Sequence, residues 1–370
     1  MIVRFLQSLY DPGFPLEHPE EEYRQLLTVI ERSGIGAQAY TLLKSGERLA
    51  EVPPFFRDRL AELYQACFVQ NYIVKRETDL LLREFDRNGI AAIPLKGTVM
   101  AERFFGHFAG RGTSDIDLLI KPDQMKEAIA CVGNAGFSTP LEENPEHYHL
   151  EWVKKIPSMP DALTVELHWS LAPDRTSRMR MEASWETSER LPGYRHARIL
   201  GTTYTFYSLC LHGASHRMDS LRYVLDLYHL LNGQRGKIDL NEVWRQACAD
   251  GTRKRVAAAL SILYSLFPEL HKRHELPFHP KVRFWKPAYV LNPPDPDGPP
   301  PHRALNKQLF MLAAMDSWRY RFAYLAHAVF PSRGLARYSM DEAGPAGSLP
   351  AMYYRLYKQR LRKLFGGAQS

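Results

Sequence analysis

The chain has 370 residues, of which 45% are hydrophobic, 24% charged and 12% aromatic, and its formal net charge is +7. This composition can build a globular core, which excludes a disordered chain and a disulfide scaffold, and the length predicts two or three lobes. The positive charge fits a polyanionic partner, either a nucleoside triphosphate or nucleic acid, and does not choose between the two.

Four cysteines lie far apart without a CxxC spacing, each among apolar neighbours: Cys67, Cys131, Cys210 and Cys248. We expect reduced, buried thiols and a cytoplasmic protein. The first 14 residues, MIVRFLQSLYDPGF, have too short an apolar segment for a signal peptide. No uninterrupted apolar run reaches the roughly 18 residues of a membrane helix, so we expect no membrane span.

The first 88 residues have apolar positions at intervals of three and four, which predicts helices. The predicted helices cover residues 21–33, 37–49 and 54–88. Gly34 and Gly36 separate the first two, and Asn88-Gly89 is a typical C-terminal cap of the third. We interpret these helices as packing elements.

A short apolar run at 90–95 then predicts a buried strand, which ends at Lys96-Gly97-Thr98 before helical spacing returns at 99–105. In a strand–glycine turn–helix unit, backbone N–H groups at the helix start can hold a phosphate. A single glycine indicates this role only weakly.

The next segment contains two acids in a strand pattern. The loop 106–114 supplies glycines, hydroxyl groups and Arg111, and a strand is predicted at 115–120. Because strand side chains alternate, Asp115 and Asp117 share one face. Two carboxylates this close repel each other unless a cation lies between them, and Mg²⁺ prefers such oxygen ligands. The pattern therefore predicts a phosphoryl-transfer site.

A helix is predicted at 123–134 after Pro122, followed by strands at 147–154 and 163–169. In the second strand Glu166 and His168 share a face, opposite the apolar side chains. Glu166 is a candidate third metal ligand; the alternative is a strand whose polar side faces water.

The remainder is predicted to be helical, with segments at 205–217, 220–231, 241–250, 253–266, 303–329 and 349–365. The stretch 291–301, LNPPDPDGPPP, is a loop because its six prolines cannot sit in a helix. The last helix carries five basic residues and no acid over YYRLYKQRLRKLF. It could touch nucleic acid or a membrane surface, but a solvated helix face is favoured.

Histidines suggest other sites. His147, His149 and His168 lie in strand segments where a structural zinc could be considered, but no cysteine completes a closed set of four ligands. His212 and His216 lie four apart on one helix face without the glutamate of a metalloprotease motif, so packing roles are favoured. Asp226 could pair with one of these two histidines.

The ordered motifs resemble the uncharacterised nucleotidyltransferases of the DNA polymerase β-like nucleotidyltransferase superfamily. The matching residues are Leu95-Lys96-Gly97, Arg111, Asp115-Ile116-Asp117-Leu118-Leu119-Ile120 and Val165-Glu166-Leu167-His168-Trp169, then His212, His216, Arg222, Asp226-Leu227 and Phe330-Pro331-Ser332. The resemblance is specific over about residues 90–170 and looser beyond 200. One departure is Gly97-Thr98, where the superfamily usually has Gly-Gly or Gly-Ser with a shorter gap before the aspartates.

The resemblance implies an α+β fold with a nucleotidyltransferase-type mixed sheet. We expect an N-terminal helical segment at 1–88, an α/β core at 89–200 and a larger C-terminal helical domain at 201–370 that contains the proline-rich loop 291–301. The acceptor should enter between the sheet and the C-terminal lobe, because clefts between domains commonly bind ligands.

The resemblance also implies Mg²⁺-dependent, or alternatively Mn²⁺-dependent, transfer of a nucleoside monophosphate from an NTP such as ATP. The acceptor would be a hydroxyl or similar group on a small molecule, sugar, peptide or protein. The expected metal and catalytic ligands are Asp115, Asp117 and Glu166, with Glu166 also a candidate base. The expected nucleotide-binding residues are Lys96, Gly97, Thr98, Arg111 and Ser114, and the acceptor-side candidates are His168, His212 and His216.

Two other functions stay open. A phosphotransferase could use the same scaffold if the γ-phosphate faced the acceptor, and a non-catalytic module could bind nucleotide alone. Nucleic acid as acceptor is disfavoured because basic residues are spread along the chain without an interleaved aromatic stripe near the acids. The sequence predicts neither the acceptor, the NTP nor the oligomeric state.

Overall fold

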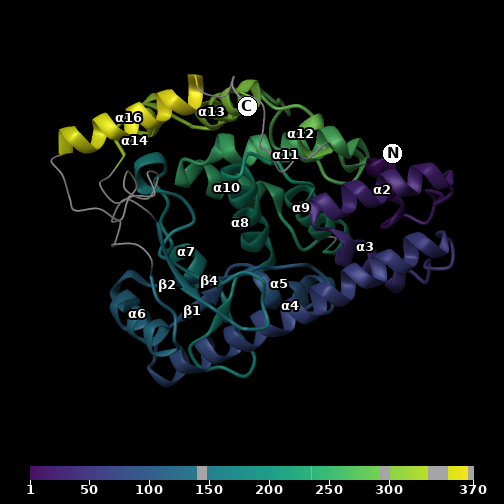
Figure 1. Cartoon of the computed structure of the whole chain (residues 1–370), viewed down its shortest axis with the longest axis horizontal. Helices are drawn as coiled ribbons and strands as arrows, with labels where there is room; N and C mark the ends of the chain where they lie inside the picture. The colour runs from purple at the N-terminus through teal and green to yellow at the C-terminus, as the bar shows by residue number, and fades with distance from the viewer. Residues whose placement is uncertain (140–147, 235, 292–300, 332–348, 366–370) are drawn as a thin grey trace.

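The fold is a small mixed sheet packed beside a large helical body, seen in a computed structural model of the chain (Figure 1). The structure describes residues 1–139, 148–234, 236–291, 301–331 and 349–365, with the backbone alone at 301–304, 349 and 360–365. The predicted loop 291–301 falls almost wholly outside these residues, as does His147. Within them, no helix is both long and apolar enough to cross a membrane.

The central sheet has the strand order β1-β2-β4-β3. Its strands are β1 (Ala92–Pro94), β2 (Asp115–Ile120), β3 (His149–Lys154) and β4 (Leu163–His168). β1 and β2 are antiparallel, β2 and β4 are parallel, and β3 and β4 are antiparallel. The parallel pair at the centre explains the buried aliphatic side chains of β2, and the mixed sheet confirms the predicted α+β class.

One long helix, α4 (Pro54–Arg87), connects the two hydrophobic cores of the protein. Its first half contributes Phe56 and Leu60 to the helical core, and its second half contributes Val74 and Phe85 to the core of the sheet. The helix is 34 residues long, which corresponds to about 51 Å. It is therefore long enough to serve both lobes.

The helical core combines both ends of the chain. It unites α1 (Ile2–Ser8), α2 (Glu20–Ser33) and α3 (Gly36–Ser45) with α8 (Thr202–Ser215), α9 (Leu221–Gly233), α10 (Leu240–Asp250) and α11 (Arg253–Leu266). Tyr10 places its hydroxyl 3.0 Å from His229 Nδ1, and Gln7 donates to Glu269. The N-terminal helices thus pack on the C-terminal helices as well as on α4 (Figure 1).

The remaining elements complete the described chain. They are α5 (Gly97–Phe105), η1 (Pro122–Gln124), α6 (Met125–Asn134), η2 (Asp174–Thr176), α7 (Glu182–Glu186), the hairpin-like pair β5 (Glu189–Arg190) and β6 (Arg198–Ile199), η3 (Pro268–Lys272), α12 (Ala288–Leu291), α13 (Pro301–Ala313), α14 (Trp318–Val329) and α16 (Leu349–Phe365). The two strands of the small sheet are antiparallel.

The single helix predicted over 303–329 is wrong, because the chain breaks between α13 and α14. Asp316 turns its carboxylate to the start of α11, where it accepts the backbone N–H groups of Arg253 at 3.0 Å and Lys254 at 2.7 Å. Ser317 then caps α14 by accepting the N–H of Tyr320. Asp316 thus binds the start of α11 and Ser317 the start of α14, so the chain between Ala313 and Trp318 is not helical.

The prediction of buried thiols holds for only two of the cysteines. All four thiols are free, and Cys131 and Cys210 are buried. Cys67 is partly exposed and Cys248 is exposed, because it lies on the outer face of the amphipathic helix α10. An apolar sequence neighbourhood therefore did not identify the buried face of that helix.

Candidate active site

Strands β2 and β4 bring three acids together on one face of the sheet. Asp117 pairs in register with Glu166, and Asp115 lies two residues earlier on the same face. One carboxylate oxygen from each of Asp115, Asp117 and Glu166 lies within 4.8 Å of the other two. The convergence predicted from sequence is therefore present.

The two oxygens of Asp117 have different surroundings. Oδ1 lies 3.0 Å from Lys96 Nζ and 3.3 Å from His168 Nε2. Oδ2 is buried and has no hydrogen-bond partner within the described part of the chain. Burial would raise the pKa of Asp117, but Lys96 and His168 outweigh it and hold that pKa well below the ordinary 3.8. Asp117 is therefore an ionised carboxylate with one uncommitted oxygen, and such an atom suits a cation.

The charge of Asp115 is less well compensated. Burial and repulsion from Asp117 raise its pKa above the ordinary 3.8, although Lys96 acts in the opposite direction. The cluster therefore holds more negative charge than its neighbours neutralise, which is the condition that favours binding of a divalent cation.

His168 lies among the acids rather than across from them. Its Nε2 atom is 3.0 Å from Glu166 Oε2 as well as 3.3 Å from Asp117 Oδ1. Burial acts to lower the pKa of His168, but hydrogen bonds to Asp117 and Glu166 raise it above 6.5 overall. This position fits a residue that orients the carboxylates better than one that faces an acceptor.

Lys96 joins the sheet to helix α8. Besides its contact with Asp117, its Nζ atom lies 3.4 Å from His212 Nδ1. Burial acts to lower the pKa of Lys96, but attraction to Asp117, Asp115 and Glu166 raises it above 10.5. Lys96 is therefore a permanent cation at the edge of the acidic cluster.

The glycine turn after β1 has the backbone that the sequence predicted. Gly97 has φ +78°, which L side chains rarely adopt, and it begins helix α5 without a side-chain cap. Thr98 is buried, and its hydroxyl has no partner among the residues described. Gly97, Thr98 and the exposed Ser114 do not line the cavity described below.

Arg111 does not have the position expected of a phosphate ligand. Its guanidinium forms two hydrogen bonds of 2.8 Å with the carboxylate of Asp226, and both residues are buried. Gln38 donates to the same carboxylate at 3.2 Å. Asp226 is therefore paired with Arg111, not with His212 or His216, and the nucleotide-binding interpretation of Arg111 loses its support.

The loop before β2 is anchored rather than flexible. Asn71 of α4 donates to the carbonyl oxygens of Phe108 and Arg111, both at 2.7 Å, and accepts the N–H of Thr113 at 3.1 Å. Asn71 itself is fully buried. The loop is thus part of the frame that positions Asp115.

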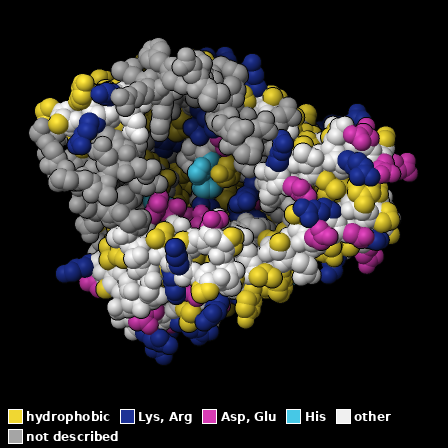
Figure 2. Space-filling model, in the orientation of Figure 1, with side chains coloured by type: hydrophobic (Ala, Val, Ile, Leu, Met, Phe, Trp, Pro, Cys, Tyr) yellow, Lys and Arg dark blue, Asp and Glu magenta, His cyan; other side chains and the backbone are white. Residues whose placement is uncertain are grey.

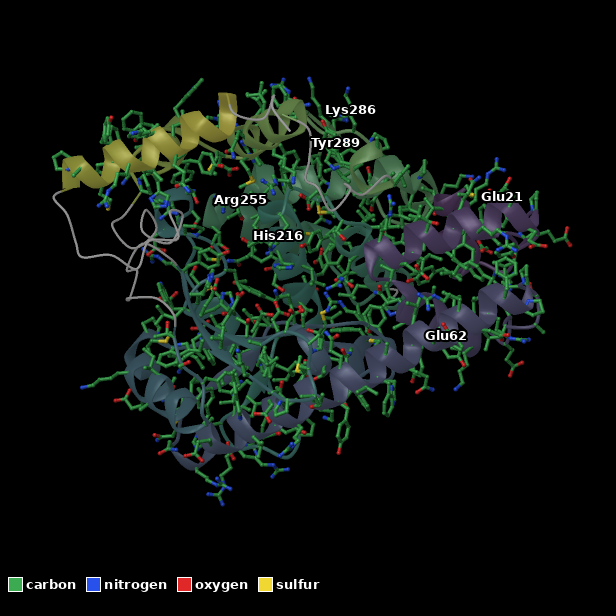
Figure 3. All side chains as sticks on the ribbon, viewed as in Figure 1. Glu21, Glu62, His216, Arg255, Lys286 and Tyr289 are labelled. Carbon is green, nitrogen blue, oxygen red and sulfur yellow. The ribbon has the colours of Figure 1, made fainter. Side chains whose placement is uncertain are left out.

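A cavity of about 360 Å³ separates the acids from helix α8. Ser208, His212, Ser215 and His216 line it from α8, at the spacing of one helix face. In the space-filling view, histidine side chains lie inside a hollow with acidic side chains below them (Figure 2), and His216 lies between the C-terminal helices and the sheet (Figure 3). The cleft between sheet and C-terminal helices therefore exists at the predicted place.

The histidines of α8 form a small aromatic group. The rings of His212 and His216 are 4.7 Å apart, and His216 stacks on Tyr223 at 5.2 Å. Burial, and then the charge of Lys96, lowers the pKa of His212 well below 6.5, and the same two causes lower that of His216. Both imidazoles are therefore neutral near pH 7, and each has one ring nitrogen that can accept a hydrogen bond.

The sequence interpretation missed part of the cavity wall. Tyr148, Glu151, Ser208 and Ser215 also line it. Ser208, His212, Ser215 and the C-cap residue His216 of α8 occupy positions i, i+4, i+7 and i+8, and this helical periodicity could have revealed the two serines. Glu151 could only be found from the pairing of β3 with β4.

Comparison with known proteins gives one family match. The model of a family described as uncharacterised nucleotidyltransferase matches residues 19–268. No curated protein matches the chain. The solution structure of the antibiotic-resistance factor ANT(2'')-Ia is similar with a TM-score of 0.32 and 13% identity, over 56% of this chain and 100% of that chain. A likeness this weak shows neither a shared fold nor a shared activity.

Proposed function

The chain belongs to the uncharacterised nucleotidyltransferase family and is thus a transferase, and we propose that it moves a nucleoside monophosphate from an NTP to an acceptor in a Mg²⁺-dependent reaction. The observation that carries this proposal is the convergence of Asp115, Asp117 and Glu166 on one face of the sheet, in front of a cavity. The acceptor would carry a hydroxyl or similar group on a small molecule, sugar, peptide or protein.

The donor set of the acidic cluster fits Mg²⁺. Its ligands are carboxylate oxygens alone, and Oδ2 of Asp117 is buried with no hydrogen-bond partner in the described ranges. Asp115, Asp117 and Glu166 would hold the ion. When bound, Mg²⁺ would neutralise charge on the triphosphate oxygens.

The side chains of this protein would then position both substrates. Lys96 keeps Asp117 ionised and oriented, and its remaining N–H groups are available to a phosphate oxygen. Gly97 and Thr98 would contribute the uncapped start of helix α5 to the phosphates. Both are buried at present, so this contact requires the nucleotide to approach along the turn.

In the reaction, the acceptor oxygen forms a bond to the α-phosphorus while the bond to the leaving pyrophosphate breaks. The proton of the acceptor hydroxyl must go to a base within reach. Glu166 lies on the sheet side of the cavity, and the neutral imidazoles of His212 and His216 lie on the opposite wall. These three groups are the candidates for that role.

We also propose that the protein is cytoplasmic. Four free thiols, one of them exposed, fit the reducing conditions of the cytoplasm.

The test is incubation with each of the four NTPs labelled at the α-phosphate, with Mg²⁺ and a panel of sugars, peptides and other hydroxyl compounds. We expect α-label on one acceptor or on the protein, with release of pyrophosphate, and loss of both in Asp115→Asn/Asp117→Asn. The matched control is Asp161→Asn, an exposed aspartate outside the cavity.

Transfer of the γ-label instead of the α-label would identify a phosphotransferase, and the mass of the product would show a single added phosphate. Nucleotide binding that depends on Mg²⁺ without transfer to any acceptor would identify a binding module. Either result would replace nucleotidyl transfer as the function of this cavity.

A further inference from the structure

Strand β3 adds nitrogen ligands to the face that carries the acids. In the β3–β4 pair, His149 is in register with His168, and Glu151 is in register with Glu166. The rings of His149 and His168 lie 4.9 Å apart. One ligand atom from each of His149, Glu166 and His168 lies within 4.8 Å of the other two.

We propose that His149, His168 and Glu166 form a second cation site, which binds a borderline divalent ion such as Zn²⁺ and shares Glu166 with the oxygen-only site. Imidazole nitrogen is a preferred ligand of zinc, whereas Mg²⁺ prefers carboxylates and water. Two adjacent sites with different ligand atoms can therefore select different metals.

Each histidine of this site has a carboxylate beside one ring nitrogen. His168 Nε2 lies 3.3 Å from Asp117 Oδ1, and His149 Nε2 lies 3.4 Å from Glu151 Oε1. Histidines that bind metals usually have such a partner, which fixes the orientation of the ring and makes it a stronger ligand. Glu151 is thus already in place as an outer partner of His149, whereas the Nε2 atom of His168 faces the proposed ligand Glu166.

The Nε2 atom of His168 is the nitrogen that would bind the ion together with Glu166. It lies 3.0 Å from Glu166 Oε2, a separation that one cation bound to both atoms can span. The Nδ1 atom lies on the opposite side of the ring and does not face Glu166.

The site is open on one side. The side chain of His149 is 14% exposed and that of Glu166 is 22% exposed, and all three ligands line the cavity. The absence of a cysteine argues against a closed structural zinc site, but three protein ligands with a fourth position for water are the usual form of an open one. The fourth position here would face the acceptor side of the cavity.

This inference goes beyond the proposed function, because it requires neither nucleotide nor acceptor. The two sites share Glu166, and His168 Nε2 of one lies 3.3 Å from Asp117 Oδ1 of the other. Asp115 belongs to the oxygen-only site alone, and His149 belongs to the nitrogen-containing site alone. Variants of these two residues therefore separate the sites.

The experiment uses full-length, metal-free protein titrated with Zn²⁺ by calorimetry in the presence of excess Mg²⁺. We expect wild type to bind Zn²⁺ and His149→Gln to bind it about 100-fold more weakly. Asp115→Asn should keep zinc binding within about threefold of wild type. His279→Gln, a change of an exposed histidine outside the cavity, is the matched control and should also keep it.

Equal zinc binding by wild type and His149→Gln would overturn the proposal. So would loss of zinc binding in Asp115→Asn with retention in His149→Gln, since zinc would then occupy the carboxylates.

Cu²⁺ bound to wild type provides a second measurement that needs no variant. Its electron paramagnetic resonance spectrum should show couplings to imidazole nitrogen, and the absence of these couplings would also overturn the site. None of these readouts depends on nucleotidyl transfer, so failure of one proposal does not imply failure of the other.

Discussion

Two groups of charged residues differ in how their charges are paired: the acidic cluster that faces the cavity, called the front here, and the buried Arg111–Asp226 pair outside the cavity lining, called the back. At the front, three carboxylates share Lys96 and His168 and face a cavity. At the back, Arg111 and Asp226 form a one-to-one bidentate pair that is sealed from solvent. Negative charge remains at the front and is cancelled at the back, so the front can bind a cation and the back can only hold the lobes together.

The largest expected effect is on nucleotidyl transfer, when an acid of the front is replaced. Asp115→Asn at the front should reduce nucleotidyl transfer on the order of 10⁴-fold, equivalent to about 5 kcal/mol, because a metal ligand is lost. The free energy of unfolding should not fall. Burial and Asp117 raise the pKa of Asp115, so its charge is unfavourable in the folded state and a neutral amide relieves that cost.

The measurements are steady-state transfer of the α-label and urea unfolding of the same preparations. A large loss of stability in Asp115→Asn would contradict the view that the front carries surplus charge. Full activity would contradict its role as a ligand.

The second largest effect concerns the stability that the buried Arg111–Asp226 pair gives to the fold. Arg111→Met should lower the free energy of unfolding by about 3 to 5 kcal/mol, because Asp226 would be left as a buried, unpaired charge. The double change Arg111→Met/Asp226→Leu should recover much of this loss, since no charge then stays buried. Urea unfolding of the two variants and wild type measures both values; a double variant as unstable as the single would show that packing, not charge, holds this pair.

The sequence predicted single elements better than the contacts between them. Strand β2 was predicted at 115–120 and helix α11 at 253–266, as the structure has them, because apolar periodicity and flanking glycine or proline residues are local signals. Register is not local. Nothing in the sequence states that Asp117 pairs with Glu166 or that Glu151 stands opposite Glu166.

Arg111 shows why the rest could not be predicted. A lone arginine in a glycine-rich loop before two aspartates is typical of a phosphate ligand. Its partner Asp226 lies 115 residues further along the chain, on a helix where the sequence suggested a histidine as the partner of this acid. Only the folded arrangement of α9 against this loop shows that the guanidinium is already bound.

A third comparison uses Mg²⁺ as a ligand of the folded state. Mg²⁺ at about 100 times its Kd should raise the free energy of unfolding of wild type by about 2.7 kcal/mol. The increment should persist in Arg111→Met and disappear in Asp115→Asn, because only the front loses a ligand. Thermal unfolding with and without Mg²⁺ at constant ionic strength measures it, and an equal increment in all three proteins would place the ion elsewhere.

The smallest effect concerns pH and helix α8. Burial, then Lys96, holds the pKa of His212 well below its ordinary 6.5, so at pH 7.5 the imidazole is neutral in both the folded and the unfolded chain. Below about pH 6.5 the unfolded chain binds a proton that the folded chain does not, and the free energy of unfolding falls by at most about 1.4 kcal/mol per pH unit for this group.

The change His212→Gln removes this loss of stability. Its free energy of unfolding, measured in urea between pH 7.5 and 5, should therefore fall less steeply than that of wild type, whereas the curve of His279→Gln should run parallel to wild type. Parallel curves for His212→Gln and wild type would mean that water reaches His212 across the cavity.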